Sequence, residues 1–177
     1  LAPVTGNPAA GDTFTLVGPE AKHAATVRRM REGEAIQVTD GKGLRLRGTV
    51  SAVEPMAVSI SVTELVSEPK PQPQIVLFQA LAKGDRDELA IQAATELGVW
   101  EVVPWQAERS ISRWDEAKRD KGRARWQTIV TEAAKQSLRA WVPEVAQIVG
   151  SKELGKLAKG FDSVLVLEPT AEETLAA

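Results

Sequence analysis

Basic side chains follow two apolar runs in the middle of the chain, at positions suited to binding an anion. Lys83 comes just after the run from Ile75 to Leu81. Arg109 and Arg113 come just after the run from Val99 to Trp105. Lysine and arginine both bind phosphate, arginine through two parallel hydrogen bonds. Open α/β sheets bind ligands at the carboxyl ends of their strands, so the three cations predict an anion-binding edge.

The segment between these runs predicts a helix, which makes the whole stretch a βαβ unit. Asp85 is placed to act as an N-cap, Glu88 three residues later suggests a capping box, and Gly98 suits a left-handed exit. The expected apolar face consists of Leu89, Ala90, Ala93, Ala94 and Leu97. Strand, helix and strand with short connections indicate a parallel sheet with a right-handed crossover.

Charge is distributed unevenly along the 177 residues, although the net charge is only −2. Residues 105–141 hold nine Lys or Arg against five Asp or Glu. A local basic surface of this kind is typical of nucleic-acid binding. Apolar residues make up 43 % of the chain, which is enough for a real core and excludes a disordered protein.

The composition also excludes several kinds of site. Without cysteine there is no disulfide, thiolate metal site or thiol nucleophile, and the single histidine, His23, leaves little scope for a metal site or a catalytic triad. We therefore expect no metal. No apolar run approaches the roughly 20 residues that span a bilayer, and no signal-peptide pattern is present, so we expect a cytoplasmic protein.

Two domains are expected on either side of a proline-rich linker. Residues 1–68 contain short alternating segments joined by turns, including Asp40-Gly41-Lys42-Gly43, which predicts a small β-barrel. Residues 69–74 form the linker, and residues 75–177 form the second domain.

The second domain continues with a long helix and a strand. The helix is expected from about Glu116 to Ala140, weakened or broken at Gly122. Residues Ser163 to Leu167 read as a buried strand of the parallel type, which Pro169 stops.

These features together resemble a known family. The residues that carry the resemblance are His23, Val27-Arg28-Arg29, Gly33, Asp40-Gly41, Gln79-Ala80-Leu81, Lys83, Glu96-Leu97-Gly98-Val99, Pro104, Arg109, Trp126, Ala133-Ala134, Gln136-Ser137, Arg139 and Pro143. Their order and spacing are similar to those of the bacterial RsmE-type 16S rRNA uridine-N3 methyltransferases of the SPOUT class. The resemblance implies an α+β chain of two domains, a PUA-like β-barrel followed by part of a trefoil-knotted α/β domain with a parallel sheet.

The resemblance also implies an activity and its partners. It is the transfer of a methyl group from S-adenosylmethionine to a uridine N3, with 16S rRNA or the small ribosomal subunit as substrate. The family usually dimerises through the knotted region, which implies a homodimer. An alternative is that this chain serves only as an RNA-binding module.

The donor-binding segment of the family is where this sequence departs. The family builds its S-adenosylmethionine site from a Gly-Pro-Glu-Gly-Gly loop and later motifs, and none of these occurs here. Leu167, Glu168 and Pro169 look like the last family element in the chain and are the expected cofactor contacts. We therefore expect the chain to be inactive by itself.

The resemblance implies a catalytic role for Arg109, which would stabilise negative charge on the uracil; the alternatives are a phosphate contact or a structural ion pair. The expected RNA-binding residues are His23, Arg28, Arg29, Lys83, Arg113 and Arg139. Arg45 and Arg47 could extend the patch of Arg28 and Arg29.

Two of these expectations have structural alternatives, and two further residues have structural roles as their expectation. His23 could instead pack under the barrel. Arg139 could instead oppose a helix dipole. Glu96 is expected to pair with a buried arginine, and Trp114 is expected to pack rather than to stack on bases.

Overall fold

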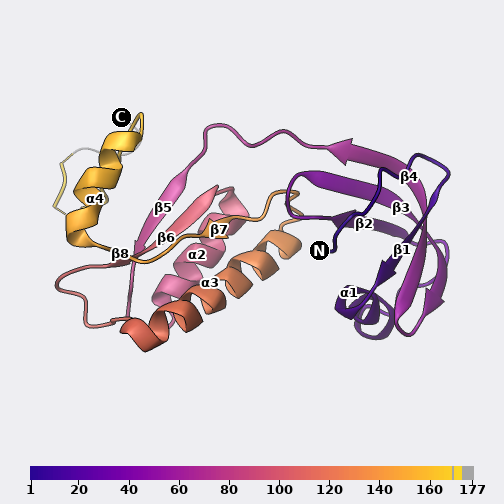
Figure 1. Cartoon of the computed structure of the whole chain (residues 1–177), viewed down its shortest axis with the longest axis horizontal. Helices are drawn as coiled ribbons and strands as arrows, with labels where there is room; N and C mark the ends of the chain where they lie inside the picture. The colour runs from indigo at the N-terminus through magenta and orange to yellow at the C-terminus, as the bar shows by residue number, and fades with distance from the viewer. Residues whose placement is uncertain (169, 173–177) are drawn as a thin grey trace.

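The computed structural model describes residues 1–168 and 170–172 and shows two domains arranged along the long axis of the molecule (Figure 1). A strip of extended chain, residues 68–75, joins them along one side. None of the described helices is both long enough and apolar enough to cross a membrane.

The N-terminal domain is an antiparallel sheet with a short helical segment. Its elements are β1 (Thr13–Val17), α1 (Pro19–Lys22), the π-helical turn η1 (His23–Val27), β2 (Ala35–Thr39), β3 (Leu44–Glu54) and β4 (Ala57–Ser67). The strand order is β1-β4-β3-β2. Among the described residues β1 and β2 are therefore edge strands. They do not pair with each other, so no hydrogen bonds between described strands close the expected barrel. The segment before β1 lies along one edge, where Ala2 N–H donates to Thr39 O at 3.0 Å.

The alternation expected for this domain is confirmed by burial. On β4, Val58, Ile60 and Val62 are buried, whereas the two residues between them are not. They pack on Leu46 and on Ala21 of α1 in a single core. Strands of this kind bury one face and leave the other to solvent or to a neighbour.

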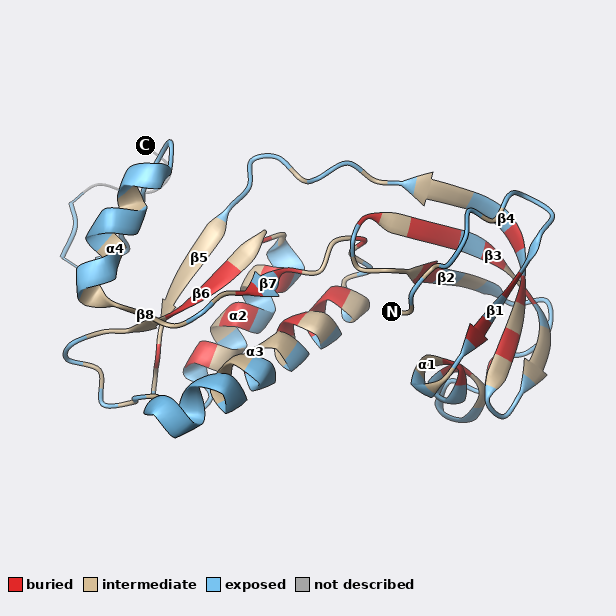
Figure 2. Ribbon diagram, viewed as in Figure 1, coloured by how far each residue is buried: buried red, intermediate tan, exposed pale blue. Residues whose placement is uncertain are grey.

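The C-terminal domain is a parallel sheet with helices. Its elements are β5 (Val76–Ala80), α2 (Arg86–Leu97), β6 (Glu101–Gln106), α3 (Glu116–Gln136), β7 (Glu144–Val145), β8 (Val149–Gly150), α4 (Ser151–Leu157) and the 3-10 turn η2 (Ala158–Gly160). β5 pairs with β6, and β6 pairs with β7 and β8, all in parallel. The buried stretches of α2, α3 and β6 face one another (Figure 2). The predicted βαβ unit is confirmed.

The face and the cap of α2 differ from the expectation. Asp85 precedes the helix with φ 55° and its side chain makes no capping bond. The Asp87 carboxylate instead accepts from Ala82 N, in the loop before the helix, at 3.1 Å. The face that packs inward carries Asp87, Ile91 and Thr95, and Leu97 is 89 % exposed. The expected stripe was right for Ala94, which packs against the core, and wrong for Leu89, Ala93 and Leu97, which are exposed. Alanines occur on several faces of this helix, and only packing against α3 selects one.

Two further expectations of this domain were wrong. α3 runs unbroken through Gly122 and ends at Gln136 rather than at Ala140. The glycine makes room for an aromatic ring, because a Cβ there would lie 2.4 Å from Trp114 Cε2. Residues 163–167 form no strand, and Leu167 is 78 % exposed. An apolar run becomes a strand only beside a partner, and no described strand pairs with it.

Candidate functional site

The loops that follow β5 and β6 are tied together at the carboxyl edge of the sheet (Figure 1). Ser110 Oγ donates to Leu81 O at 2.6 Å, and Ser112 Oγ donates to Ala82 O at 2.8 Å. These bonds hold the loop that carries Arg109, residues 107–115, against the loop that carries Lys83. The expectation that the two strand ends form one edge is therefore confirmed.

The loop of residues 107–115, called here the arginine loop, is also held by contacts with β6 and α3 and by one bond within the loop. Trp114 N donates to Gln106 Oε1 at 2.9 Å. The Trp114 ring packs edge-on against Trp126, with centroids 5.2 Å apart, as the packing alternative expected. Arg113 Nη2 donates to Glu108 O at 2.7 Å, so part of this guanidinium is used within the loop. Bracing of this kind fixes the backbone on which Arg109 sits.

Ser151, the first residue of α4, is a further anchor at this edge. Its Oγ accepts from Trp105 Nε1 at 3.2 Å and from Glu108 N at 3.3 Å. Sequence reasoning missed all three serines. Loop serines are common, and only the fold shows that these reach main-chain and indole groups from other elements.

Arg109 and Lys83 are exposed, and neither has a hydrogen-bond or ion-pair partner among the described residues. Two unneutralised cations on adjoining loops suit an anionic ligand such as the phosphates of a nucleic acid.

Several other cations of the basic middle segment are already paired. Arg125 forms an ion pair with Glu88, and its hydrogen bond holds the pKa of that carboxyl below its ordinary value. Arg123 Nε donates to Val145 O at 2.7 Å. Lys118 binds Asp115, whose pKa is lowered by that hydrogen bond. Arg119 and Lys121 are exposed, with no such partner in the described chain. The free charge of this segment is therefore smaller than its composition suggests.

The expected RNA contacts of the first domain form a separate group. His23, Arg28 and Arg29 are exposed on and after η1, and Arg29 has φ 51°. Figure 1 shows α1 at one end of the molecule and α4, beside the carboxyl edge, at the other. Arg45 and Arg47 do not extend the group as an open patch, because Arg45 is buried and Arg47 binds Glu64 at 2.9 Å.

Arg139 points into the protein. Its guanidinium donates to Thr95 O and Val99 O, both at 2.8 Å, and burial lowers its pKa. These carbonyls lie at the end of α2, where a cation is favoured by the helix dipole. This supports the dipole alternative, although the helix is α2 and not Arg139's own. Glu96 does not pair with an arginine as expected; its Oε1 accepts from Gln92 Nε2 at 3.1 Å.

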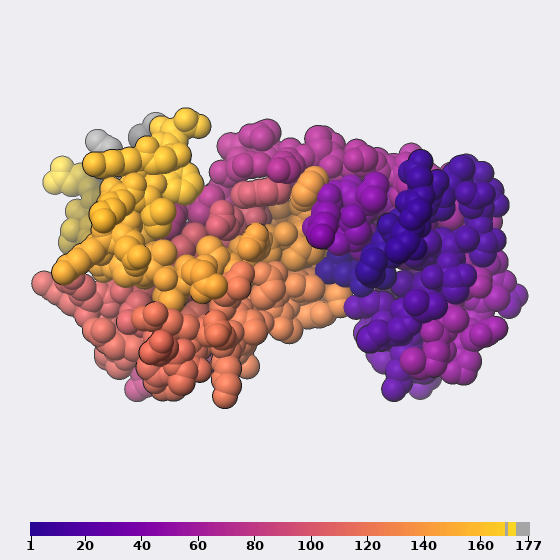
Figure 3. Space-filling model, in the orientation of Figure 1, coloured from indigo at the N-terminus to yellow at the C-terminus, as the bar shows by residue number. Residues whose placement is uncertain are grey.

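The expected cofactor contacts are not part of an enclosed site. Leu167 and Glu168 are exposed. Figure 3 shows the C-terminal residues, in yellow, on the outside of the molecule at the end away from the N-terminal domain. Pro169 lies outside the described residues. The hollows of about 550 and 580 Å³ lie elsewhere, one where the domains meet and one beside β1. Among the described residues no group of three or more His, Asp or Glu is arranged to hold a metal.

Comparison with protein families matches most of the chain. Residues 16–62 match an RNA methyltransferase PUA domain, and residues 68–177 match an RNA methyltransferase domain. Ribosomal RNA small subunit methyltransferase E of Mycobacterium tuberculosis is 38 % identical over 95 % of this chain and 66 % of its own length. The Bacillus subtilis protein of the same name is 36 % identical over 87 % of this chain and 60 % of its own length. The chain thus spans less than two thirds of these relatives.

Two solved structures are similar in fold to this chain. A ribosomal RNA small subunit methyltransferase E from Neisseria gonorrhoeae, bound to S-adenosyl methionine, has a TM-score of 0.70 and 30 % identity over 85 % of this chain and 61 % of that one. A putative methyltransferase from Legionella pneumophila, in complex with the bound cofactor SAM, has a TM-score of 0.78 and 28 % identity over 97 % of this chain and 71 % of that one.

Proposed function

This chain belongs to the RNA methyltransferase family, and on that premise we propose that it is part of an enzyme that methylates a uridine N3 of 16S rRNA. The observation that carries the proposal is the carboxyl edge, where Arg109 and Lys83 stand free on loops joined by Ser110 and Ser112. The relatives named as small-subunit rRNA methyltransferases support the substrate class.

Arg109 is the proposed catalytic residue. Methylation at N3 of uracil breaks the N3–H bond, with the proton passing to water, and the ring carries negative charge until the bond from N3 to the methyl carbon has formed. A cation held nearby stabilises that charge more in the transition state than in the ground state. Lys83, on the adjoining loop, is proposed to hold a phosphate of the same RNA, since its ammonium is a point charge without geometric demands.

S-adenosylmethionine is the proposed methyl donor, because it is bound in two solved relatives. The described residues do not fit it: Leu167 and Glu168 are exposed and enclose no pocket. No step of the mechanism is therefore assigned to the donor here, and we propose that this chain alone is inactive.

RNA binding is proposed to involve both groups of cations. His23, Arg28 and Arg29 would contact backbone phosphates from the PUA domain, and Arg113 would do so beside the carboxyl edge. Arg139 is left out of the proposed contacts, because its donors already serve main-chain carbonyls. Two further proposals are that the enzyme is a cytoplasmic homodimer and that the PUA domain closes as a barrel.

The test of the catalytic role is Arg109→Ala in an active form of the protein that includes this chain. We expect turnover to fall by about 10²-fold or more, the usual effect of losing a group that stabilises transition-state charge, while RNA affinity falls much less. Arg119→Ala is the matched control, since Arg119 is also an exposed, unpaired cation but lies on α3. Equal losses of turnover and affinity would reduce Arg109 to an RNA contact.

The test of RNA binding is the dependence of affinity on salt. Each phosphate contact adds a slope of about −0.9 for duplex or −0.7 for single strands in a plot of log affinity against log salt. We expect a steep slope that becomes shallower in Arg28→Ala. A flat dependence would contradict a phosphate-led mode.

A further inference from the structure

The two domains meet around a buried arginine, Arg45 of β3, which is 8 % exposed. Its Nη2 donates to Leu138 O, just past the end of α3 in the other domain, at 2.8 Å. Its Nη1 donates to Gln37 Oε1 on β2 at 3.0 Å, and its Nε forms an ion pair with Glu68 after β4. One guanidinium therefore joins three segments from both domains.

The charge of Arg45 makes this contact between the domains, called here the joint, favour one relative arrangement of the two domains. A guanidinium shielded from water is tolerated only while its donors are satisfied. Leu138 O is at the negative end of the α3 dipole, where a cation is favoured. If the domains separated or rotated, Arg45 would lose this acceptor and would have to be rehydrated.

Close backbone contacts surround Arg45. Gly43 N donates to Ala140 O at 3.0 Å, and Val142 N donates to Gly41 O at 2.9 Å. A Cβ on Gly43 would lie 2.5 Å from Trp141 Cζ2, so only glycine leaves room for the indole to pack against the turn that contains Gly43. The indole Nε1 in turn donates to Glu68 O at 3.0 Å.

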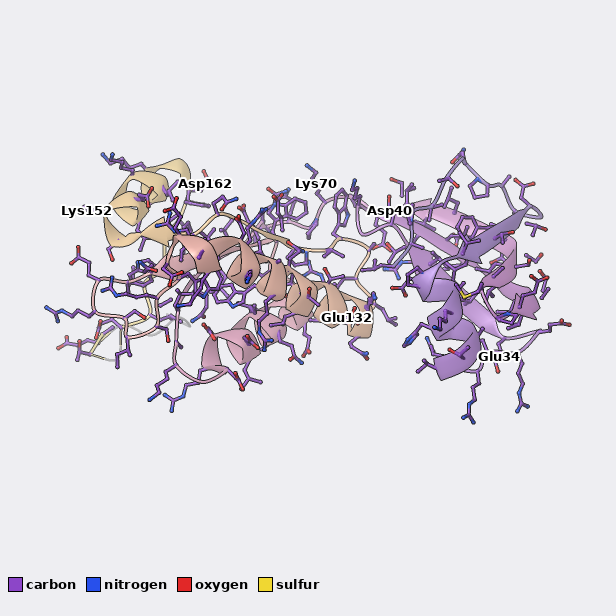
Figure 4. The ribbon with its side chains drawn as sticks, turned by 60° about the horizontal axis from the view of Figure 1, so that its bottom comes forward. Glu34, Asp40, Lys70, Glu132, Lys152 and Asp162 are labelled. Atoms are coloured by element: carbon purple, nitrogen blue, oxygen red, sulfur yellow. The ribbon has the colours of Figure 1, made fainter. Side chains whose placement is uncertain are left out.

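The joint is closed at its edges by charged contacts. Lys135 of α3 binds Glu20 of α1 at 2.7 Å. Lys70 of the linker lies over the Trp100 ring at 5.5 Å from its centroid, so the linker is not a free spacer. Figure 4 shows Asp40 and Lys70 where the domains meet, with Glu34 toward one end of the molecule and Lys152 toward the other.

We propose that Arg45 is a positioning residue that locks the PUA and methyltransferase domains into one rigid body, so that the cations after η1 and those of the carboxyl edge engage a single RNA at a fixed separation. The proposal rests on the proposed RNA binding for its functional part, while the lock itself does not. Two sites held at a matching separation bind one ligand more tightly than the same sites on a loose tether.

The first measurement is domain tumbling by ¹⁵N relaxation, without RNA. We expect one rotational correlation time for both domains in the native chain and two different times in Arg45→Met. Arg47→Met is the matched control, because Arg47 lies on the same strand but its partner, Glu64, is in its own domain. Uniform tumbling in Arg45→Met would overturn the lock.

The second measurement is affinity for a folded 16S rRNA fragment that is long enough to reach both groups. We expect Arg45→Met to weaken binding by about tenfold or more, as a loss of effective concentration does, while Arg47→Met changes it less than twofold. Loosened tumbling with unchanged affinity would refute the positioning role.

Two results separate this proposal from the proposed function. If the native chain binds no RNA but Arg45→Met still makes the two domains tumble separately, the proposed RNA binding is refuted and the proposed role of Arg45 in fixing the domains is supported. If Arg45→Met does not fold, Lys135→Met tests the same joint at its edge, since Lys135 is only partly buried and binds Glu20 across the domains. Unchanged tumbling and RNA affinity in that variant would then count against the lock.

Discussion

Replacing Gly122 by alanine should destabilise the C-terminal domain, although glycine is normally unfavourable inside a helix. In an ordinary exposed helix the change to alanine stabilises by about 1 kcal/mol. Here the added Cβ would lie 2.4 Å from Trp114 Cε2 and 2.6 Å from Trp114 Cδ2, well inside contact distance. The indole would have to move.

The expected size follows from what holds that indole. Trp114 packs edge-on against the buried Trp126, and an aromatic pair of this kind contributes about 0.5–1.5 kcal/mol beyond its buried area. Overpacking in a filled site costs about 1–3 kcal/mol. With both costs counted and the helix-propensity gain of about 1 kcal/mol subtracted, we expect Gly122→Ala to lower the free energy of unfolding by about 0.5–3.5 kcal/mol.

Urea unfolding followed by circular dichroism measures this change, and a double-mutant cycle tests its cause. In a Trp114→Ala background, Gly122→Ala should become stabilising by about 1 kcal/mol, because the clash is gone. Gly155→Ala in α4 is the control, since a Cβ there would meet nothing within 4 Å. If Gly122→Ala stabilises the native chain, or has the same effect in both backgrounds, the argument for a close indole contact is refuted. Because Trp114 anchors the arginine loop, RNA affinity should fall as well.

Three other outcomes are expected. The pKa of Glu101 is raised in the folded protein by burial and by the charge of Glu144. As pH rises above 4.5, the Glu101 carboxyl therefore ionises in the unfolded chain before it does so in the folded protein. The free energy of unfolding falls over this range, until the folded-state pKa of Glu101 is passed. Glu101→Gln should therefore raise the melting temperature at neutral pH and leave it unchanged well below 4.5; a gain at low pH instead would reverse the sign of the argument. Arg139→Met should lower the free energy of unfolding by about 1–3 kcal/mol, because its hydrogen bonds to main-chain carbonyls are lost, while RNA affinity stays the same. A loss of RNA affinity with no loss of stability would show that Arg139 contacts RNA. Calorimetry of the 177-residue chain with S-adenosylmethionine should show no binding, and micromolar affinity would mean that the donor site has been placed wrongly.

Part of the candidate site could be predicted because it depends on short-range order. Apolar runs, one helix signature and tight connections are enough to specify a parallel βαβ unit. In such a unit the residues after each strand must share an edge, and this alone predicts that Lys83 and Arg109 lie at the same edge of the sheet. The boundary between the domains is predicted for a similar reason, since prolines at alternate positions cannot continue a strand ladder.

The partners of the polar side chains could not be predicted, because they come from distant parts of the chain. Arg45 and Arg47 are two residues apart on one strand, and simple alternation predicts the same face for both. Nothing local shows that Arg45 meets a carbonyl 93 residues away, whereas Arg47 meets Glu64 in solvent.

The sequence by itself determined the family, the two-domain order, the parallel sheet and the edge where chemistry is proposed. These follow from patterns of burial that repeat over a few residues and from the order of motifs. Only the tertiary structure decided which arginines are free to bind a ligand and which are used in packing: within the described part of the chain Arg109 has no partner, whereas Arg139 and Arg45 bind main-chain carbonyls. A guanidinium binds whichever acceptors the fold brings to it, and that choice is made by packing across the whole chain.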